Sequence, residues 1–267
     1  MAAVPGRECL FRDLADATYA LKIPKLWLNE TWDEVQEVKF SRPDYDYDCC
    51  PSTKAADCLM DEFGLEPIGE MFKYEYAPSP QAVARADEFA AAHSPYVLIH
   101  PHSESSNIDK NLTDEETATA IDICQQAGFK PVMVDFGGRF AKWQKSRQDI
   151  VWLHKWHGWG SEWRCPSADL TAALIARARA VIGIDSGVEH LAGTTTTPTI
   201  VVWRDPQVFH PVHFFDLSPN VLHLIQYSVA PLMRTETEQY FQAHYRHEMI
   251  CGVTGWIRER LAEVLTG

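Results

Sequence analysis

The chain has 267 residues, of which 46% are hydrophobic, and this length allows one large domain or two smaller ones with well-buried cores. Its formal net charge of −13 disfavours non-specific binding to nucleic acid, which depends on Lys and Arg side chains that neutralise phosphates. No apolar run approaches the roughly 18 residues of a membrane-spanning helix, and the first residues lack the charged-then-apolar order of a signal peptide, so we expect a globular protein without a transmembrane segment.

The first 77 residues are irregular in pattern and contain two expected helices. One covers Leu10–Leu21, and the other covers Ser52–Phe63, which Ser52 opens and Gly64 closes. The segment Ala77–Pro80 reads Ala-Pro-Ser-Pro, which marks a linker because proline disrupts both helix and sheet.

From about Gln81 the pattern becomes regular, with apolar strands separated by helices of about 10–15 residues. This alternation predicts an α/β fold built on a doubly wound parallel sheet. After the sheet ends near Ile225, two helices are expected at Glu236–His247 and Gly255–Leu265. Within the regular part, the expected helices are Ala82–Ala92, Asp114–Ala127 (ended by Gly128) and Ser167–Ala178 (capped by Ser167 and Asp169), and the expected strands are Tyr96–His100, Pro131–Asp135, Ile150–Leu153, Val181–Ile184 and Ile200–Val202.

The strongest sign of a binding site is a polar turn, Asp185-Ser186-Gly187, that lies between two expected buried strands. Ser186 and Glu189 have the Ser-x-x-Glu spacing of a capping box, which predicts a helix start with free backbone N–H groups. A helix start after a parallel strand is where α/β folds bind anions, and His190 lies one turn further along. Singly, Gly187 and His190 have ordinary structural explanations; together the pattern favours a phosphate or nucleotide site.

The segment Ile182–Trp203, with Asp185-Ser186-Gly187, His190-Leu191-Ala192 and Pro198, resembles the donor-site motif of glycosyltransferase family 9. These are heptosyltransferase-like enzymes with a GT-B fold, and the similarity extends over roughly Ser94–Pro219. The resemblance implies a Rossmann-like donor-binding domain at 81–235 after a smaller, abbreviated N-terminal acceptor-side α/β domain at 1–80. It further implies that C-terminal helices in 236–267 pack back on the N-terminal part, burying Trp256, Ile257 and Leu261 against residues before Pro78.

The loop after the first strand of this domain contains hydroxyl side chains and Lys110. By position, Ser103 or Ser105 and Lys110 match the family residues that hold the donor diphosphate, and Lys110 would stabilise the leaving group. The alternative is a hydrophilic loop in which Lys110 is simply solvated.

Gly137 and Gly138 follow the next strand, and glycines there suit close approach of a ribose or base. Arg139 and Lys142 stand where the family often has an acidic residue for the ribose, which leaves the nucleoside open. The resemblance therefore implies donor contacts from Ser103, Ser105, Lys110, Gly137, Asp185, Ser186, Gly187 and His190.

Two groups of residues raise the question of a metal site. His154 and His157 lie among four tryptophans between Trp152 and Trp163, where we favour a base or sugar subsite or local packing over zinc. The seven cysteines show no Cys-x-x-Cys spacing, so we expect reduced thiols. A metal site from Cys49, Cys50 and Cys58 is the remaining alternative.

The N-terminal part departs most from the family. Gly6 is followed by Arg7, where the family has a Gly-Asp turn whose carboxylate acts as general base. The candidate bases are Glu8, Asp13 and Asp16, of which we favour Asp13; each is otherwise a solvated helix charge.

The resemblance implies an inverting, metal-independent glycosyltransferase without a cofactor, which moves a sugar from a nucleotide-diphospho-sugar to a hydroxyl of a glycan or other acceptor. It favours an ADP-sugar. The expected reduced cysteines favour a cytoplasmic location, either free or at the periphery of the inner membrane. The oligomeric state leaves no signal in the sequence. One alternative is a catalytically silent nucleotide-sugar-binding protein, which the missing Gly-Asp turn would suit. The other is a glycosyltransferase acting on a modified nucleic-acid base, against which the acidic composition speaks.

Overall fold

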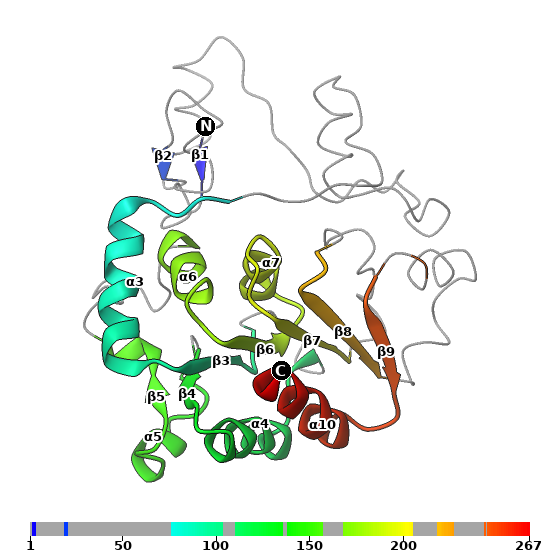
Figure 1. Cartoon of the computed structure of the whole chain (residues 1–267). Coiled ribbons are helices and arrows are strands. Elements are labelled where there is room, and N and C mark those ends of the chain that lie inside the picture. Colours follow the sequence, from blue (N-terminus) through cyan, green and yellow to red (C-terminus); the bar gives the residue numbers. More distant parts are fainter. Residues whose placement is uncertain are drawn as a thin grey trace, which may run out of the picture.

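The computed structural model describes residues 2–3, 19–20, 76–103, 110–135, 138–156, 168–204, 218–226, 243 and 245–267 (Figure 1). Near the N-terminus, β1 (Ala2–Ala3) and β2 (Tyr19–Ala20) pair in parallel. The helix predicted over Leu10–Leu21 is therefore wrong at its C-terminal end, because the backbone there pairs with a neighbouring strand. The rest of that helix and the predicted helix Ser52–Phe63 lie outside the described residues.

The centre of the molecule is a seven-stranded sheet in the order β5-β4-β3-β6-β7-β8-β9, with every neighbouring pair parallel. The order of the strands along the chain reverses between β3 and β6. At such a reversal, the connections leave the two carboxyl ends toward opposite faces of the sheet, and ligands of α/β folds bind in the crevice between them. The strands are β3 (Tyr96–His100), β4 (Lys130–Met133), β5 (Val151–Trp152), β6 (Ala180–Ile184), β7 (Thr199–Trp203), β8 (Val221–Gln226) and β9 (His247–Ile250).

Helices cover both faces of this sheet, which confirms the predicted doubly wound α/β fold. Figure 1 shows α3 (Pro80–His93), α6 (Ala168–Ile175) and α7 (Gly187–Gly193) on one face, and α4 (Asp114–Gln126) and α10 (Val253–Thr266) on the other. Two short elements were not predicted: α5 (Trp143–Ser146) and a single 3-10 turn at Leu153–Lys155. None of the helices described is long and apolar enough to cross a membrane.

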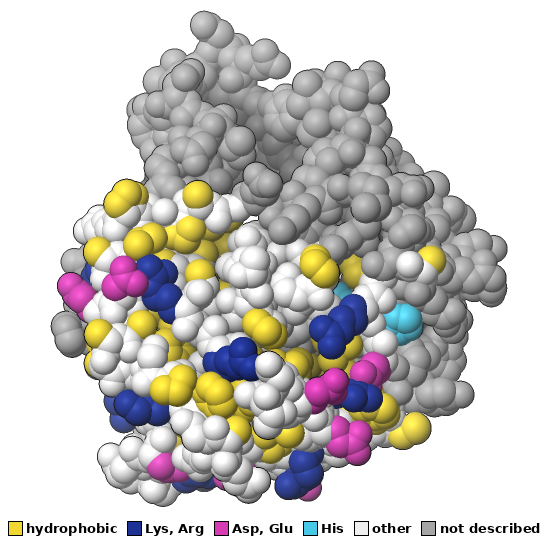
Figure 2. All heavy atoms as spheres, in the orientation of Figure 1, with side chains coloured by type: hydrophobic (Ala, Val, Ile, Leu, Met, Phe, Trp, Pro, Cys, Tyr) yellow, Lys and Arg dark blue, Asp and Glu magenta, His cyan; other side chains and the backbone are white. Residues whose placement is uncertain are grey.

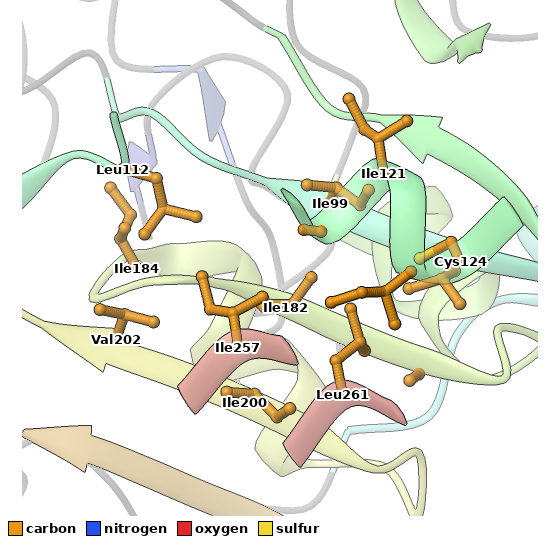
Figure 3. Close-up of a cluster of buried hydrophobic side chains, with 14 of the residues drawn as sticks. Ile99, Leu112, Ile121, Cys124, Ile182, Ile184, Ile200, Val202, Ile257 and Leu261 are labelled. Carbon is orange, nitrogen blue, oxygen red and sulfur yellow. The ribbon is translucent and has the colours of Figure 1, made fainter. Parts of the chain in front are cut away.

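The central strands β3, β4 and β6 contribute side chains to two separate cores, because successive residues point to opposite faces. On β3, Tyr96 and Leu98 pack toward α3 and α6, whereas Val97 and Ile99 pack toward α4 and α10. Figure 3 shows the second core, in which isoleucines and valines of the strands meet α4 and α10. Burying one such side chain contributes about 1.5–3 kcal/mol, so both faces contribute substantially to folding.

The boundaries of α4 follow directly from its sequence. Thr113 accepts a hydrogen bond from the backbone N–H of Glu116, whose carboxylate accepts one from the N–H of Thr113, completing a capping box. After the helix, Gly128 adopts φ 81°, a left-handed conformation that glycine reaches without steric cost. The predicted end of this helix at Gly128 is confirmed.

The C-terminal region corrects two predictions. The sheet does not end near Ile225, because β9 pairs with β8, so a helix reaching His247 is wrong at that residue. Helix α10 confirms the last predicted helix, but it packs on α4 and on the strands, and Ile257 and Leu261 are fully buried in the core of the sheet. Trp256 packs against the same core. Among the described residues, Ile257 and Leu261 pack on the sheet and α4, where packing against residues before Pro78 was predicted, while the domain bounds 1–80, 81–235 and 236–267 stay predictions.

The physical reason is the apolar stripe of α10. Val253, Ile257, Leu261 and Leu265 repeat every four residues and form one face of the helix. Burying these apolar side chains is favourable only against other apolar side chains, and the sheet face beside α4 provides them (Figure 3). An ion pair between Arg260 and Glu248 of β9, with Nε and Oε1 2.7 Å apart, ties the helix to the strand before it.

A truncation at the centre of this stripe tests the placement of α10. Leu261→Ala should lower the free energy of unfolding by about 2–5 kcal/mol, since it opens a cavity in a core that the sheet cannot close. Arg258→Ala, on the exposed side of the same helix, should stay within about 0.5 kcal/mol of the parent. Urea unfolding followed by circular dichroism measures both. Equal stability of the two variants would mean that α10 is a surface helix.

Candidate functional site

The polar turn of the motif lies at the reversal between β3 and β6. Ser186 caps α7, and its Oγ accepts a hydrogen bond from the backbone N–H of Val188 at 3.4 Å. Gly187 is the exposed first residue of the helix, and a Cβ at that position would meet no atom within 4 Å. The turn therefore presents its backbone at the edge where parallel sheets bind ligands.

Three of the predicted donor-site side chains meet around this turn. His190 Nε2 lies 3.5 Å from Asp185 Oδ1, and both side chains are partly exposed, at 33% and 21%. From the far side of the reversal, the Lys110 ammonium donates a hydrogen bond to the backbone carbonyl of Asp185 at 3.0 Å. The structure thus brings Lys110, Asp185, Ser186 and His190 together, although 75 residues separate Lys110 from Asp185.

The loop that carries Lys110 is fixed at both of its described ends. The backbone N–H of Ser103 donates to Asn111 Oδ1 at 3.0 Å, which ties the start of the loop to its end. Arg204, just after β7, donates to the backbone carbonyl of Asn111 at 3.2 Å and pairs with the buried carboxylate of Glu116. Nothing in the sequence near Arg204 indicates this role, because its partners are 93 and 88 residues away.

Glu189 does not complete the predicted capping box. Its carboxylate instead lies 3.1 and 3.2 Å from His100 Nδ1, and both side chains are buried. The helix start at Ser186 is confirmed, but the role predicted for Glu189 is wrong, because its carboxylate reaches β3 instead of the backbone N–H of Ser186. The sequence does contain one sign of this contact. Gly183 is a lone glycine inside a buried strand, and such a glycine often marks a close approach of other atoms.

A second group of polar atoms comes from the carboxyl ends of β3 and β5 and the residues that follow them. Among the described residues, neither ring nitrogen of His102 has a hydrogen-bond partner, and the same holds for Trp152 Nε1 and His154 Nδ1. His102 and Trp152 are 7% and 6% exposed, and the ring of Phe140 lies against both. Buried polar atoms usually have a partner, so this group is suited to hydrogen-bonding a ligand.

Burial, and then the nearby charge of Arg139, lowers the pKa of His102 to about 4. The pKa of His154 is also lowered by burial. Both imidazoles are therefore neutral near pH 7, and each ring has one donor and one acceptor nitrogen. Such a lining is suited to an uncharged, hydrogen-bonding part of a ligand.

Asp135 follows β4 and contacts the turn after it. Its carboxylate accepts hydrogen bonds from the backbone N–H groups of Arg139 and Phe140 at 3.0 and 3.2 Å. It thereby holds the turn that begins with Gly138, which has φ 67°. The turn predicted to approach a nucleoside is thus fixed from within, and Arg139 is exposed.

Several predicted residues lie outside the described part of the chain: Asp13 and the alternative bases Glu8 and Asp16, Ser105, Gly137, His157, and Cys49, Cys50 and Cys58. Their predicted roles stay predictions. Within the part that is described, no three His, Cys, Asp or Glu side chains gather closely enough to hold a metal ion.

Comparison with solved structures gives the fold a context. The chain is similar to the crystal structure of the glycosyl transferase family 9 from Veillonella parvula DSM 2008, with a TM-score of 0.51 and 14% identity over 96% of this chain and 65% of that one. It is also similar to E. coli heptosyltransferase WaaC with ADP, with a TM-score of 0.42 and 16% identity over 71% of this chain and 55% of that one. The chain thus spans 65% of the length of the first structure, and that likeness supports the fold alone.

Comparison with sequences gives the family. None of the curated proteins compared with the chain matches it. Residues 68–224 match the model of glycosyltransferase family 9 (heptosyltransferase). This stretch covers the strands β3 to β7, the first part of β8 and the whole group around Asp185. Because the match extends over more than half of the 267 residues, the chain belongs to glycosyltransferase family 9.

Proposed function

We propose that the protein is a glycosyltransferase that moves a sugar from a nucleotide-diphospho-sugar to an acceptor hydroxyl. The observation that carries the proposal is the meeting of Lys110, Asp185, Ser186 and His190 at the strand reversal of a family 9 chain. The family motif supports a donor site there, and the position at the reversal supports it independently.

The donor diphosphate would lie between Lys110 and the Ser186 turn. An ammonium group has three donors, so the hydrogen bond from Lys110 to Asp185 leaves capacity for phosphate oxygens. When the bond to the sugar breaks, negative charge grows on the departing diphosphate, and a fixed cation stabilises that state more than the bound donor. Lys110 would therefore act mainly on turnover.

The nucleoside would lie against His102, Trp152 and His154. Neutral imidazoles and an indole N–H suit hydroxyls and the edge of a base better than phosphates, since they offer hydrogen bonds without charge. An ADP-sugar is the donor that the family resemblance favours.

On the acceptor side, a carboxylate from residues 1–80 would take the proton of the attacking hydroxyl, and Asp13 is our candidate. The hydroxyl oxygen would attack the anomeric carbon from the face opposite the diphosphate, which inverts the configuration at that carbon. Because Lys110 would supply the positive charge, the reaction would need no metal ion. A cytoplasmic location is part of the same proposal.

Release of nucleoside diphosphate from a panel of ADP-, GDP-, UDP- and dTDP-sugars tests the activity, after a thermal-shift screen of the same compounds selects the donor. Binding without any turnover, across hydroxyl acceptors, would favour the alternative of a silent nucleotide-sugar-binding protein. The nucleic-acid-base alternative predicts strongly salt-dependent binding to DNA. On the face seen in Figure 2, acidic and basic side chains are interspersed, which does not favour that alternative.

Removing either side chain of the exposed pair should weaken donor binding. Asp185→Ala and His190→Ala should each cost about 1–3 kcal/mol, the scale of one charge-assisted hydrogen bond. Isothermal titration calorimetry with the donor found in the screen measures this. Asp122→Ala, an exposed carboxylate on α4 outside the site, is the matched control. If all three variants bind like the parent, the donor site lies elsewhere.

Lys110→Ala should reduce kcat by a larger factor than it raises KM for the donor, because the interaction of Lys110 grows as the diphosphate leaves. Steady-state kinetics of nucleoside diphosphate release separates the two constants. An equal change in both, or a change in KM alone, would contradict a role for Lys110 in leaving-group stabilisation.

The lowered pKa of His102, about 4, makes stability depend on pH. An unfolded histidine titrates near about 6.5, so below that pH the unfolded chain binds a proton that the folded chain excludes. Stability is therefore complete above about pH 6.5 and falls as the pH drops toward 4, by at most about 1.4 kcal/mol per unit. In urea unfolding at pH 7 and pH 5, His102→Gln should lose less stability than the parent. Identical losses would show that His102 titrates normally.

A further inference from the structure

A buried polar contact joins the end of β3 to the first turn of α7, and the proposed chemistry makes no direct use of it. His100 is the last residue of β3 and is 1% exposed, while Glu189 is 0% exposed. The imidazole Nδ1 lies 3.1 and 3.2 Å from the two carboxylate oxygens. A carboxylate removed from water needs such a partner, and this one comes from 89 residues away.

Strand β6 is shaped to admit this carboxylate. In the sheet, His100 pairs with Gly183, which stands two residues before Asp185. A Cβ on Gly183 would lie 1.9 Å from Glu189 Oε1 and 2.7 Å from the backbone carbonyl oxygen of His100. Both contacts are far too short, so only glycine leaves room for the carboxylate at this strand position.

The same spacing elsewhere in the chain gives a different result. At α4, Glu116 reaches back to the N–H of Thr113 and completes a capping box within its own helix. At α7, the glutamate in the corresponding position turns away from its cap and contacts β3, where His100 provides the partner and Gly183 the space. Glu189 therefore links two elements instead of stabilising one helix end.

This link fixes the part of the molecule that carries the donor-site side chains. Helix α7 has only seven residues, and Val188 and Ala192 anchor its apolar side in the core. Apolar contacts are not directional, whereas a hydrogen-bonded pair fixes the rotation of the first turn. The hydroxyl of Ser186 also lies 3.3 Å from His100 Nδ1, so the same imidazole contacts both the cap and the glutamate.

We propose that Glu189 and His100, with Gly183, form a buried pair that positions the Asp185–His190 turn for the donor. They are positioning residues, because both are buried and act through Ser186, Asp185 and His190. The proposal rests on the proposed function as far as the donor is concerned. The fixing of the turn itself does not depend on any ligand.

The test uses Glu189→Gln, His100→Asn, the double variant, and Asp169→Asn as control. Asp169 is a comparably buried carboxylate, 8% exposed, that accepts hydrogen bonds from Tyr76 and Ser79 on the far side of α6. Two quantities are measured in the full chain: amide hydrogen exchange of Val188, Glu189 and His190 relative to the amides of β8, and the Kd for ADP by calorimetry.

Each single variant at the pair should speed exchange in α7 relative to β8 and raise the Kd for ADP about tenfold, the scale of a lost hydrogen bond to a charged group. The Kd for ADP of the double variant should not exceed the higher of the two Kd values of the single variants, because all three variants lose the same contact. Asp169→Asn should lower the melting temperature while leaving the Kd for ADP within about twofold of the parent.

Exchange in α7 and a Kd for ADP that match the parent in Glu189→Gln would overturn the proposal, as would an equal change in Kd in Asp169→Asn. If Glu189→Gln does not fold, His100→Asn is measured in its place, and the same two outcomes decide. If the parent itself does not bind ADP, the proposed donor fails. The exchange rates then decide the pair alone: faster exchange in α7 supports it, and unchanged exchange overturns it.

Discussion

The pairing of β3 with β6 is the constraint on which the rest of the site depends. The paired residues are distant in sequence, yet the register of the two strands places Ile99 beside Ile182 and His100 beside Gly183. Their carboxyl ends therefore meet at one point of the sheet edge, and the connections that follow lead to opposite faces. Lys110 reaches this point from one connection, and the Asp185–His190 turn begins the other.

The polar residues near this edge divide into two kinds according to their partners. Glu189, Glu116 and Asp135 are buried and have their hydrogen bonds satisfied within the protein, so each fixes a loop or a helix start. Asp185 and His190 are partly exposed. This difference gives the two kinds different functions, since a buried carboxylate with its partner is structural while an exposed pair is accessible to a ligand.

The residues at the sheet edge offer different surroundings to the uncharged and the charged parts of the proposed donor. Burial keeps His102 neutral, and the ring of Phe140 lies between it and Trp152 of β5. Lys110 stands at the reversal itself, where a diphosphate would lie. A nucleotide-diphospho-sugar has the same order of groups, a neutral nucleoside followed by two charged phosphates, so the arrangement of the edge supports the proposed class of donor.

Local sequence patterns are sufficient to predict the doubly wound sheet, the two ends of α4 and the family. Those features depend on local periodicity, on caps such as Thr113 and Gly128, and on a contiguous motif, all of which neighbouring residues specify. Local patterns do not predict the partner of Glu189, the hydrogen bond of Arg204 to the loop after β3, or the strand at His247–Ile250. Each of these depends on a residue or strand distant in the chain. A local spacing such as Ser-x-x-Glu does not reveal that the glutamate has another hydrogen-bond partner on a neighbouring strand. The same holds for α10. Its apolar stripe is visible in the sequence, but the surface on which it packs is the sheet face beside α4, which forms only when distant strands pair.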